Sequence, residues 1–99
     1  MFKKYENDEE IIYEPIHSVL KKALKKYGIK EQSLIAIEEM SELTKELIKN
    51  HRGKPNEDQI AEEVADVLIT IDQVIEGYGI AGDVERWIDF KINRLEERM

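Results

Sequence analysis

The chain has 99 residues and a formal net charge of −7, with 37% charged and 41% hydrophobic residues. That length suits one domain and is too short for two independent cores. The acidic balance argues against duplex nucleic acid or an anionic membrane as the main partner, because phosphate binding depends on Lys and Arg. Cysteine is absent, which excludes disulfides, thiol catalysis and thiolate metal sites. No apolar run approaches the ~18 residues of a membrane span, so we expect a soluble, unprocessed, cytoplasmic protein.

The N-terminal part of the chain is predicted to be an arm followed by a first helix. Residues 1–13 are polar and irregular in pattern, and we expect them to form an arm of the single domain 1–99. From Pro15, apolar residues recur at helical spacing until Gly28 stops the pattern. Lysines on the other face of this helix indicate a solvated basic surface.

The next two helices are predicted to lie on either side of a short basic loop. One helix runs from about Lys30 to Asn50, and Gly53 follows near the position that favours a left-handed residue. Asn56 then has the features of an N-cap in a capping box, with acidic residues in the first turn. The helix that it starts is predicted to continue to about Tyr78.

The last helix is predicted to begin after two glycines, with Asp83 as its cap, and to reach the C-terminus. Beside its apolar stripe lies a ridge of one aromatic and three basic side chains at helical spacing. Such a ridge suits phosphate binding if an acidic metal site is close; otherwise it balances neighbouring acids and its aromatic residue belongs to the core. The residues of this basic ridge are Trp87, Lys91, Arg94 and Arg98.

Together these elements predict an all-α fold, a small antiparallel four-helix bundle joined by short turns. The sequence has no strand-like alternation, no fixed repeat and no long linker. Apolar residues away from the main stripes, such as Ile37, Ile48 and Ile69, add more hydrophobic surface than a thin bundle can hide. We therefore expect a homodimer or a dimer of dimers to complete the bundle.

The second and third predicted helices each carry acidic residues beside an apolar stripe. If these stripes pack antiparallel, the carboxylates converge, and their mutual repulsion favours a bound cation. Oxygen ligands with no Cys or neighbouring His suit a hard divalent cation such as Mg²⁺ better than zinc. The predicted metal ligands are Glu39, Glu42, Glu63 and Asp66.

The compound spacing of these acids is more specific than any one pair in a chain with 22 acidic residues. The stretch I-E-E-M-S-E-L carries E-E-x-x-E, and E-E-V-A-D-V-L on the next helix carries E-x-x-D. This pattern resembles the MazG-like nucleotide pyrophosphohydrolases, which are all-α enzymes. The likeness runs from about Gln32 through the C-terminal K-I-N-R-L-E-E-R and leaves the N-terminal arm outside.

The resemblance implies Mg²⁺-dependent hydrolysis of a nucleoside triphosphate between the α and β phosphates, giving a monophosphate and diphosphate. Mn²⁺ can substitute for Mg²⁺ in such enzymes, and their expected role is house-cleaning of nucleotide pools. Carried over by position, the four acids above are the metal ligands, and Glu38 is the catalytic residue that activates or orients the attacking water. Lys91 and Arg94 would meet the phosphates, with Trp87 beside them in the substrate site. The base is not specified by these residues.

Three other interpretations remain open. A related phosphoribosyl-ATP pyrophosphohydrolase would carry Lys-x-Gly and Tyr-His where residues 35–37 and 69–70 are Ile-Ala-Ile and Ile-Thr. A di-iron carboxylate bundle needs Glu-x-x-His on two helices, and only Glu14-x-x-His17 has that spacing. The third is a non-catalytic acidic adaptor whose charges form a solvated face. An adaptor should show no Mg²⁺-dependent change in thermal stability, whereas an enzyme should.

Overall fold

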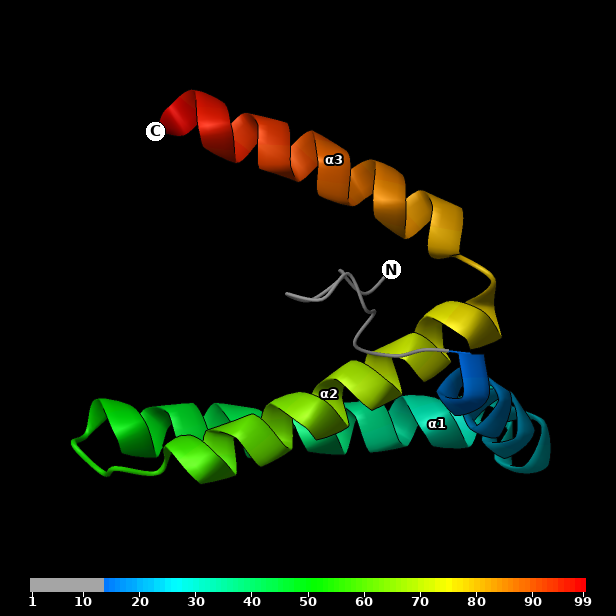
Figure 1. The fold of residues 1–99 in the computed structure, drawn as a ribbon, viewed down its shortest axis with the longest axis horizontal. Coiled ribbons are helices and arrows are strands. Elements are labelled where there is room, and N and C mark those ends of the chain that lie inside the picture. The colour runs from blue at the N-terminus through cyan, green and yellow to red at the C-terminus, as the bar shows by residue number, and fades with distance from the viewer. Residues whose placement is uncertain (1–13) are drawn as a thin grey trace.

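The fold is helical throughout the part of the chain that the computed structural model describes, residues 14–99. Its elements are α1 (Glu14–His51), α2 (Glu57–Tyr78) and α3 (Ala81–Arg98), drawn in Figure 1. These residues contain no strand, which confirms the predicted all-α class. The predicted N-terminal arm lies outside the described residues. None of the described helices is both long and apolar enough to cross a membrane.

A sharp break at Gly28 divides α1 into two segments, residues 14–27 and 29–51. The backbone of Gly28 has φ 85° and ψ 160°, a conformation that glycine adopts far more readily than residues with a side chain. The two segments run in different directions (Figure 1). The sequence predicted that the first helix stops at Gly28; the structure adds that the next segment follows without an intervening loop.

The second segment of α1 and all of α2 lie side by side and antiparallel, as a helical hairpin (Figure 1). Gly53 ends α1 in a left-handed conformation, with φ 102°. Its N–H donates to the carbonyl of Asn50 at 2.9 Å, and the N–H of Lys54 donates to the carbonyl of Lys49 at 3.1 Å. This pair of bonds is a Schellman motif, so the predicted helix end is confirmed.

Asn56 occupies the predicted N-cap position of α2, and its carbonyl accepts the Ile60 N–H at 3.0 Å. The predicted capping box is wrong, because the Asn56 side chain makes no capping hydrogen bond. Its Nδ2 instead donates to the backbone carbonyl of Glu46 at 2.9 Å and to Glu46 Oε1 at 2.7 Å. The amide nitrogen therefore ties the loop to α1, while Asn56 Oδ1, the atom that would accept a capping hydrogen bond, is buried without a partner.

The first segment of α1 packs against the C-terminal half of α2. His17 Nδ1 lies 3.6 Å from Asp72 Oδ2, and Lys21 Nζ lies 3.8 Å from Glu76 Oε1. Just after the break, Ile29 approaches Gly77 so closely that a methyl group at Gly77 would overlap the Ile29 side chain. The three contacts fix the direction of the first segment relative to the hairpin.

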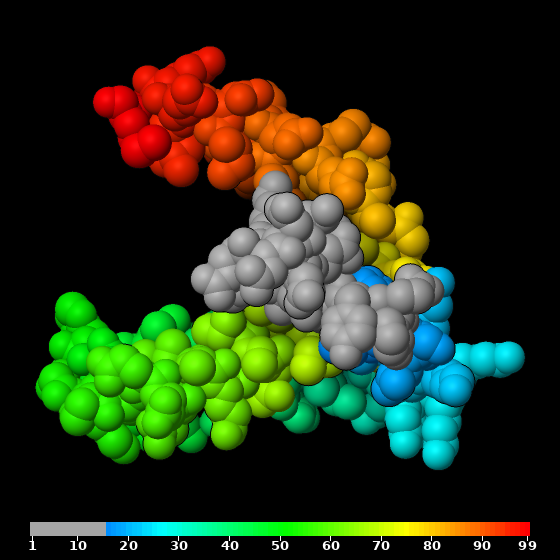
Figure 2. All heavy atoms as spheres, in the orientation of Figure 1, coloured from blue at the N-terminus to red at the C-terminus, as the bar shows by residue number. Residues whose placement is uncertain are grey.

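The helix α3 leaves the hairpin directly after a tight turn. Gly79, with φ 65°, donates to the Glu76 carbonyl at 3.2 Å, and the Ile80 N–H donates to the Ile75 carbonyl at 3.1 Å. Within residues 14–99, α3 contacts α2 alone and does not contact α1. The described part of a single chain therefore forms no closed four-helix bundle. Figure 2 shows the C-terminal end of α3 and the loop end of the hairpin as separate arms.

The described residues bury little apolar side-chain surface. Ala36 and Ile75 are the two hydrophobic residues among them that are buried. Large hydrophobic side chains are exposed on all three helices; among them are Leu34, Ile37, Met40, Leu47, Ile48, Val64, Ile69, Trp87, Phe90 and Ile92.

Candidate metal centre

Three acidic side chains meet where the second segment of α1 faces α2. Glu39 comes from α1, and Glu63 and Asp66 come from successive turns of α2. Each offers one carboxylate oxygen, and the three oxygens lie within 4.8 Å of one another. All three residues are half-buried. We call these residues the acidic cluster, and they are three of the four metal ligands that the sequence predicted.

Glu42, the fourth predicted ligand, lies one turn from Glu39 on the same side of α1. It is outside the acidic cluster. Its Oε2 lies 3.7 Å from Lys45 Nζ, and its side chain is half exposed. Lys45 therefore competes with the cluster for the Glu42 carboxylate. The two residues are three positions apart on one helix, a spacing that favours ion pairs. Glu42 is close enough to add its negative charge to the electrostatics of the cluster.

The electrostatics of the acidic cluster disfavour three negative charges without a cation. The pKa of Glu39 is raised above its usual value. The causes, largest first, are burial, the side-chain hydrogen bond with Asp66, and the negative charges of Asp66, Glu63 and Glu42. Burial, followed by the charges of Asp66 and Glu42, also raises the pKa of Glu63. In addition, Glu63 Oε2 is buried without a hydrogen-bond partner. A buried oxygen of this kind calls for a proton or a cation.

Two polar side chains near the acidic cluster make hydrogen bonds to other groups and do not belong to the cluster. The Thr70 hydroxyl donates within its own helix, to the carbonyls of Asp66 and Val67 at 3.0 and 3.1 Å. Glu46 continues the acidic line on α1, but the hydrogen bond from Asn56 and the nearby Lys49 hold its pKa below the usual value, against the effect of burial. Glu46 therefore stabilises the loop after α1 by accepting the hydrogen bond from Asn56.

Glu38, the predicted catalytic residue, is exposed on α1. Glu38 directly precedes Glu39 in the chain, so the two side chains point about 100° apart around the helix. Among the described contacts, no hydrogen bond or ion pair holds Glu38 in place. It stands beside the acidic cluster as a free carboxylate that faces solvent.

The predicted substrate-binding residues Trp87, Lys91 and Arg94 lie on α3 and are all exposed. The rings of Trp87 and Phe90 meet edge to face with centroids 5.8 Å apart. The Arg94 guanidinium lies 5.6 Å from the Phe90 ring centroid. Because α3 does not contact α1 in residues 14–99, one chain does not bring these side chains to the acidic cluster.

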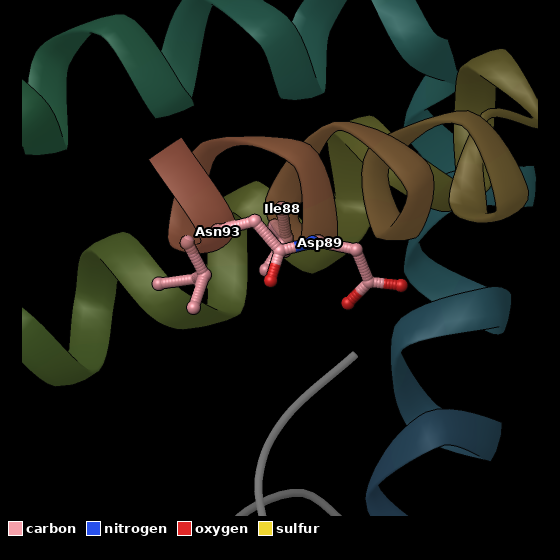
Figure 3. Close-up of a pocket in the computed structure, with 4 residues that line it drawn as sticks. Ile88, Asp89 and Asn93 are labelled. Carbon is pink, nitrogen blue, oxygen red and sulfur yellow. The ribbon is translucent and has the colours of Figure 1, made fainter. Parts of the chain in front are cut away.

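A hollow of about 550 Å³ runs along α3 (Figure 3). Its described lining consists of Ile88, Asp89, Ile92 and Asn93. None of these residues belongs to the acidic cluster or to the predicted site. The hollow marks a face of α3 that described residues of α1 and α2 leave uncovered.

The sequence analysis did not predict two polar features of the fold. One is the Asn56–Glu46 clamp, whose partners are ten residues apart across the loop. The other is Asp72, which is 8% exposed and has a pKa raised by burial, an effect that the nearby His17 opposes. An acid inside the apolar run I-T-I-D-Q-V-I was the available signal for Asp72.

Comparison of the chain with protein-family models, with curated proteins and with solved structures found no match.

Proposed function

We propose that the protein is a Mg²⁺-dependent nucleoside triphosphate pyrophosphohydrolase, which converts a nucleoside or deoxynucleoside triphosphate and water into the monophosphate and diphosphate. The observation that carries the proposal is the acidic cluster of Glu39, Glu63 and Asp66 between two helices. The proposal is further supported by the E-E-x-x-E and E-x-x-D spacing, which resembles that of MazG-like enzymes.

The acidic cluster fits a hard divalent cation in its donor chemistry. Its ligand atoms are all carboxylate oxygens, which suit Mg²⁺ and also Mn²⁺. The raised pKa values of Glu39 and Glu63 and the buried, unpartnered Oε2 of Glu63 indicate negative charge in need of neutralisation. Glu42 would join as a further ligand by leaving Lys45. The bound cation would supply neutralisation of phosphate charge in the transition state.

The other predicted residues would activate the attacking water and bind the phosphates and the base. Glu38 is an exposed carboxylate next to a ligand, where it can accept the proton of the attacking water. Lys91 and Arg94 carry the positive charge that the phosphates require. Trp87 is 60% exposed and offers a ring on which a base can stack.

The proposal includes a homodimer, or a dimer of dimers, because one chain leaves so much apolar surface open. Around α1, the exposed Leu34, Ile37 and Ile48 lie about 140–180° from Glu39 at 100° per residue. A second copy can therefore cover this apolar side of the hairpin and leave the acidic cluster accessible.

The proposal is tested by product analysis on a panel of canonical and modified nucleoside triphosphates with Mg²⁺. Monophosphate and diphosphate are the expected products, and chelation of the metal should abolish the reaction. Glu63→Gln should be inactive, whereas Glu62→Gln, at the exposed neighbouring position, should retain activity as the matched control. Release of nucleoside diphosphate and orthophosphate, or no turnover of any triphosphate, would refute the proposal.

A further inference from the structure

We infer that Gln73 is a specificity-determining residue, which recognises the base of the substrate at the interface between the second segment of α1 and α2. The identity of the ligand as a nucleotide rests on the proposed function. The presence of a ligand-binding amide at this place rests on the burial, the hydrogen bonding and the position of Gln73.

The side chain of Gln73 is buried without the hydrogen bonds that an amide needs. It is 3% exposed, and its Oε1 accepts no hydrogen bond. Burial of an amide oxygen that lacks a partner costs free energy, so such groups are rare in folded proteins. The hydroxyl of Ser33 on α1 is likewise buried without a partner. A ligand that carries N–H groups can satisfy an acceptor of this kind.

Gln73 lies on the side of α2 that carries the acidic cluster. It is seven residues from Asp66, which is nearly two turns, so the two side chains point within about 20° of each other and lie about 10 Å apart along the helix axis. Gln32, which is 6% exposed, has the same relation to Glu39 on α1. Because the helices are antiparallel and Glu39 meets Asp66, the two glutamines come level with each other. They form a second polar level of the interface, next to the acidic cluster.

The chemistry of Gln73 suits a base rather than a phosphate. Its Oε1 is an acceptor, so it disfavours a phosphate oxygen and favours an N–H group. An amide pairs with a donor and an adjacent acceptor on the edge of a base, as glutamine does with adenine. The ribose and the α phosphate of a nucleotide can connect a base at Gln73 to phosphates at the acidic cluster. The unpartnered amide therefore makes the site selective for a nucleotide over a bare polyphosphate.

The first segment of α1 controls access to Gln73. It contacts α2 at Asp72 and Glu76, which lie about 100° and 60° around the helix from Gln73 on one side. The segment therefore covers the flank of the interface next to Gln73, beside the C-terminal half of α2 (Figure 1). The ion pair of Lys21 with Glu76 is largely exposed, and exposed pairs contribute little to stability. Movement of the segment about the break at Gly28 can admit the base.

Nucleoside binding tests the inference without metal and without any assay of activity. The wild type is titrated in EDTA with adenosine, cytidine, guanosine and uridine, with ribose as the ligand that lacks a base, and binding is followed by protein NMR. At least one nucleoside should bind and ribose should not. Gln73→Leu should weaken that binding by about tenfold, because leucine offers no acceptor.

The matched control is Gln59→Leu, which makes the same substitution at an exposed position seven residues from Asp66 in the other direction. It should bind the nucleoside as the wild type does. Absence of nucleoside binding to the wild type, equal binding of ribose, or unchanged binding by Gln73→Leu would each overturn the inference.

Thermal unfolding of the ligand-free protein tests whether the Gln73 amide is unsatisfied. Gln73→Leu should melt at a higher temperature than the wild type, because it removes a buried polar group that has no partner and keeps a side chain of similar size. Gln59→Leu gives the effect of the substitution at an exposed position. A Gln73→Leu variant that melts at a lower temperature, or does not fold, would show that the amide stabilises the fold itself and would overturn the inference.

Hydrolysis in Mg²⁺ separates this inference from the proposed function. For the best nucleoside triphosphate, kcat/KM should fall about tenfold in Gln73→Leu and stay unchanged in Gln59→Leu. Full activity of Gln73→Leu would overturn the inference and leave the proposed function intact. A wild type that binds a nucleoside through Gln73 but hydrolyses no triphosphate would overturn the proposed function and support the nucleoside-binding role of Gln73.

Discussion

At the scale of single residues, the acidic cluster carries a free-energy cost that depends on pH. The pKa of Glu39 is raised in the folded protein, so the folded state binds its proton more tightly than the unfolded state does. The protein is therefore destabilised above this raised pKa, and it gains stability as pH falls toward the ordinary value. Bound Mg²⁺ should remove the same cost at neutral pH.

The first prediction is that Glu39→Gln stabilises the metal-free protein. Glutamine keeps the shape of the side chain and removes the charge that Asp66 and Glu63 repel. In EDTA near pH 7, the variant should have a Tm a few degrees above that of the wild type, and the difference should shrink as pH is lowered through the raised pKa. The exposed Glu38→Gln serves as the control. A variant that melts below the wild type at pH 7 would contradict the account of the cluster.

A second prediction concerns the clamp at the other end of the hairpin. Asn56 is 1% exposed and donates two hydrogen bonds to Glu46, so Asn56→Ala should destabilise the protein by about 1–2 kcal/mol. Asn56→Asp should cost more, because it puts a carboxylate against the Glu46 carboxylate. Urea unfolding measures both. Since the pKa of Glu46 is lowered, its stabilising effect should be present above the ordinary glutamate pKa and be lost as pH falls through the lowered one. An Asn56→Ala variant as stable as the wild type would mean that the clamp contributes nothing.

At the scale of elements, the contact between Gly77 and Ile29 fixes the hairpin against the break in α1. We predict that Gly77→Ala destabilises the protein, since the new methyl group overlaps Ile29 and overpacking costs about 1–3 kcal/mol. In an Ile29→Ala background the overlap with Cδ1 and Cγ1 disappears and only the approach to Cβ, at 3.2 Å, remains, so the same substitution should cost much less, with helix propensity contributing up to about 1 kcal/mol in its favour. A double-mutant cycle by chemical denaturation measures both effects. An equal cost of Gly77→Ala in both backgrounds would argue against the close approach.

The helices and the convergence of three of the four predicted acids were predictable because both follow from local spacing. Apolar periodicity and the glycines at positions 28, 53 and 79 set the helix ends, and the spacing of Glu63 and Asp66 put them on one side of α2. The direction of α3 was not predictable, since it depends on the backbone angles of a two-residue turn. Glu42 and Asn56 differed from prediction because their side chains contact Lys45 and Glu46, and helical spacing alone does not predict these contacts.

At the scale of the whole molecule, the small number of buried hydrophobic residues predicts association. Light scattering at micromolar concentration should give two or four times the 11.6 kDa mass of one chain. Trp87 is the one tryptophan, so its emission should shift to shorter wavelength in the assembled protein and return toward the solvent-exposed value on dilution. An active sample with the mass of a single chain would contradict the dimer.

The most direct test of the central claim, a metal centre at the acidic cluster, is the Tm as a function of Mg²⁺ concentration. At ten times its Kd, Mg²⁺ should add about 1.4 kcal/mol to the free energy of unfolding, which is roughly 5–10 °C in Tm for a domain of this size. The shift should be seen in the wild type and in Glu62→Gln, and it should be lost in Glu63→Gln. A wild-type Tm that does not respond to Mg²⁺, or a Glu63→Gln variant that responds as strongly as the wild type, would contradict the account.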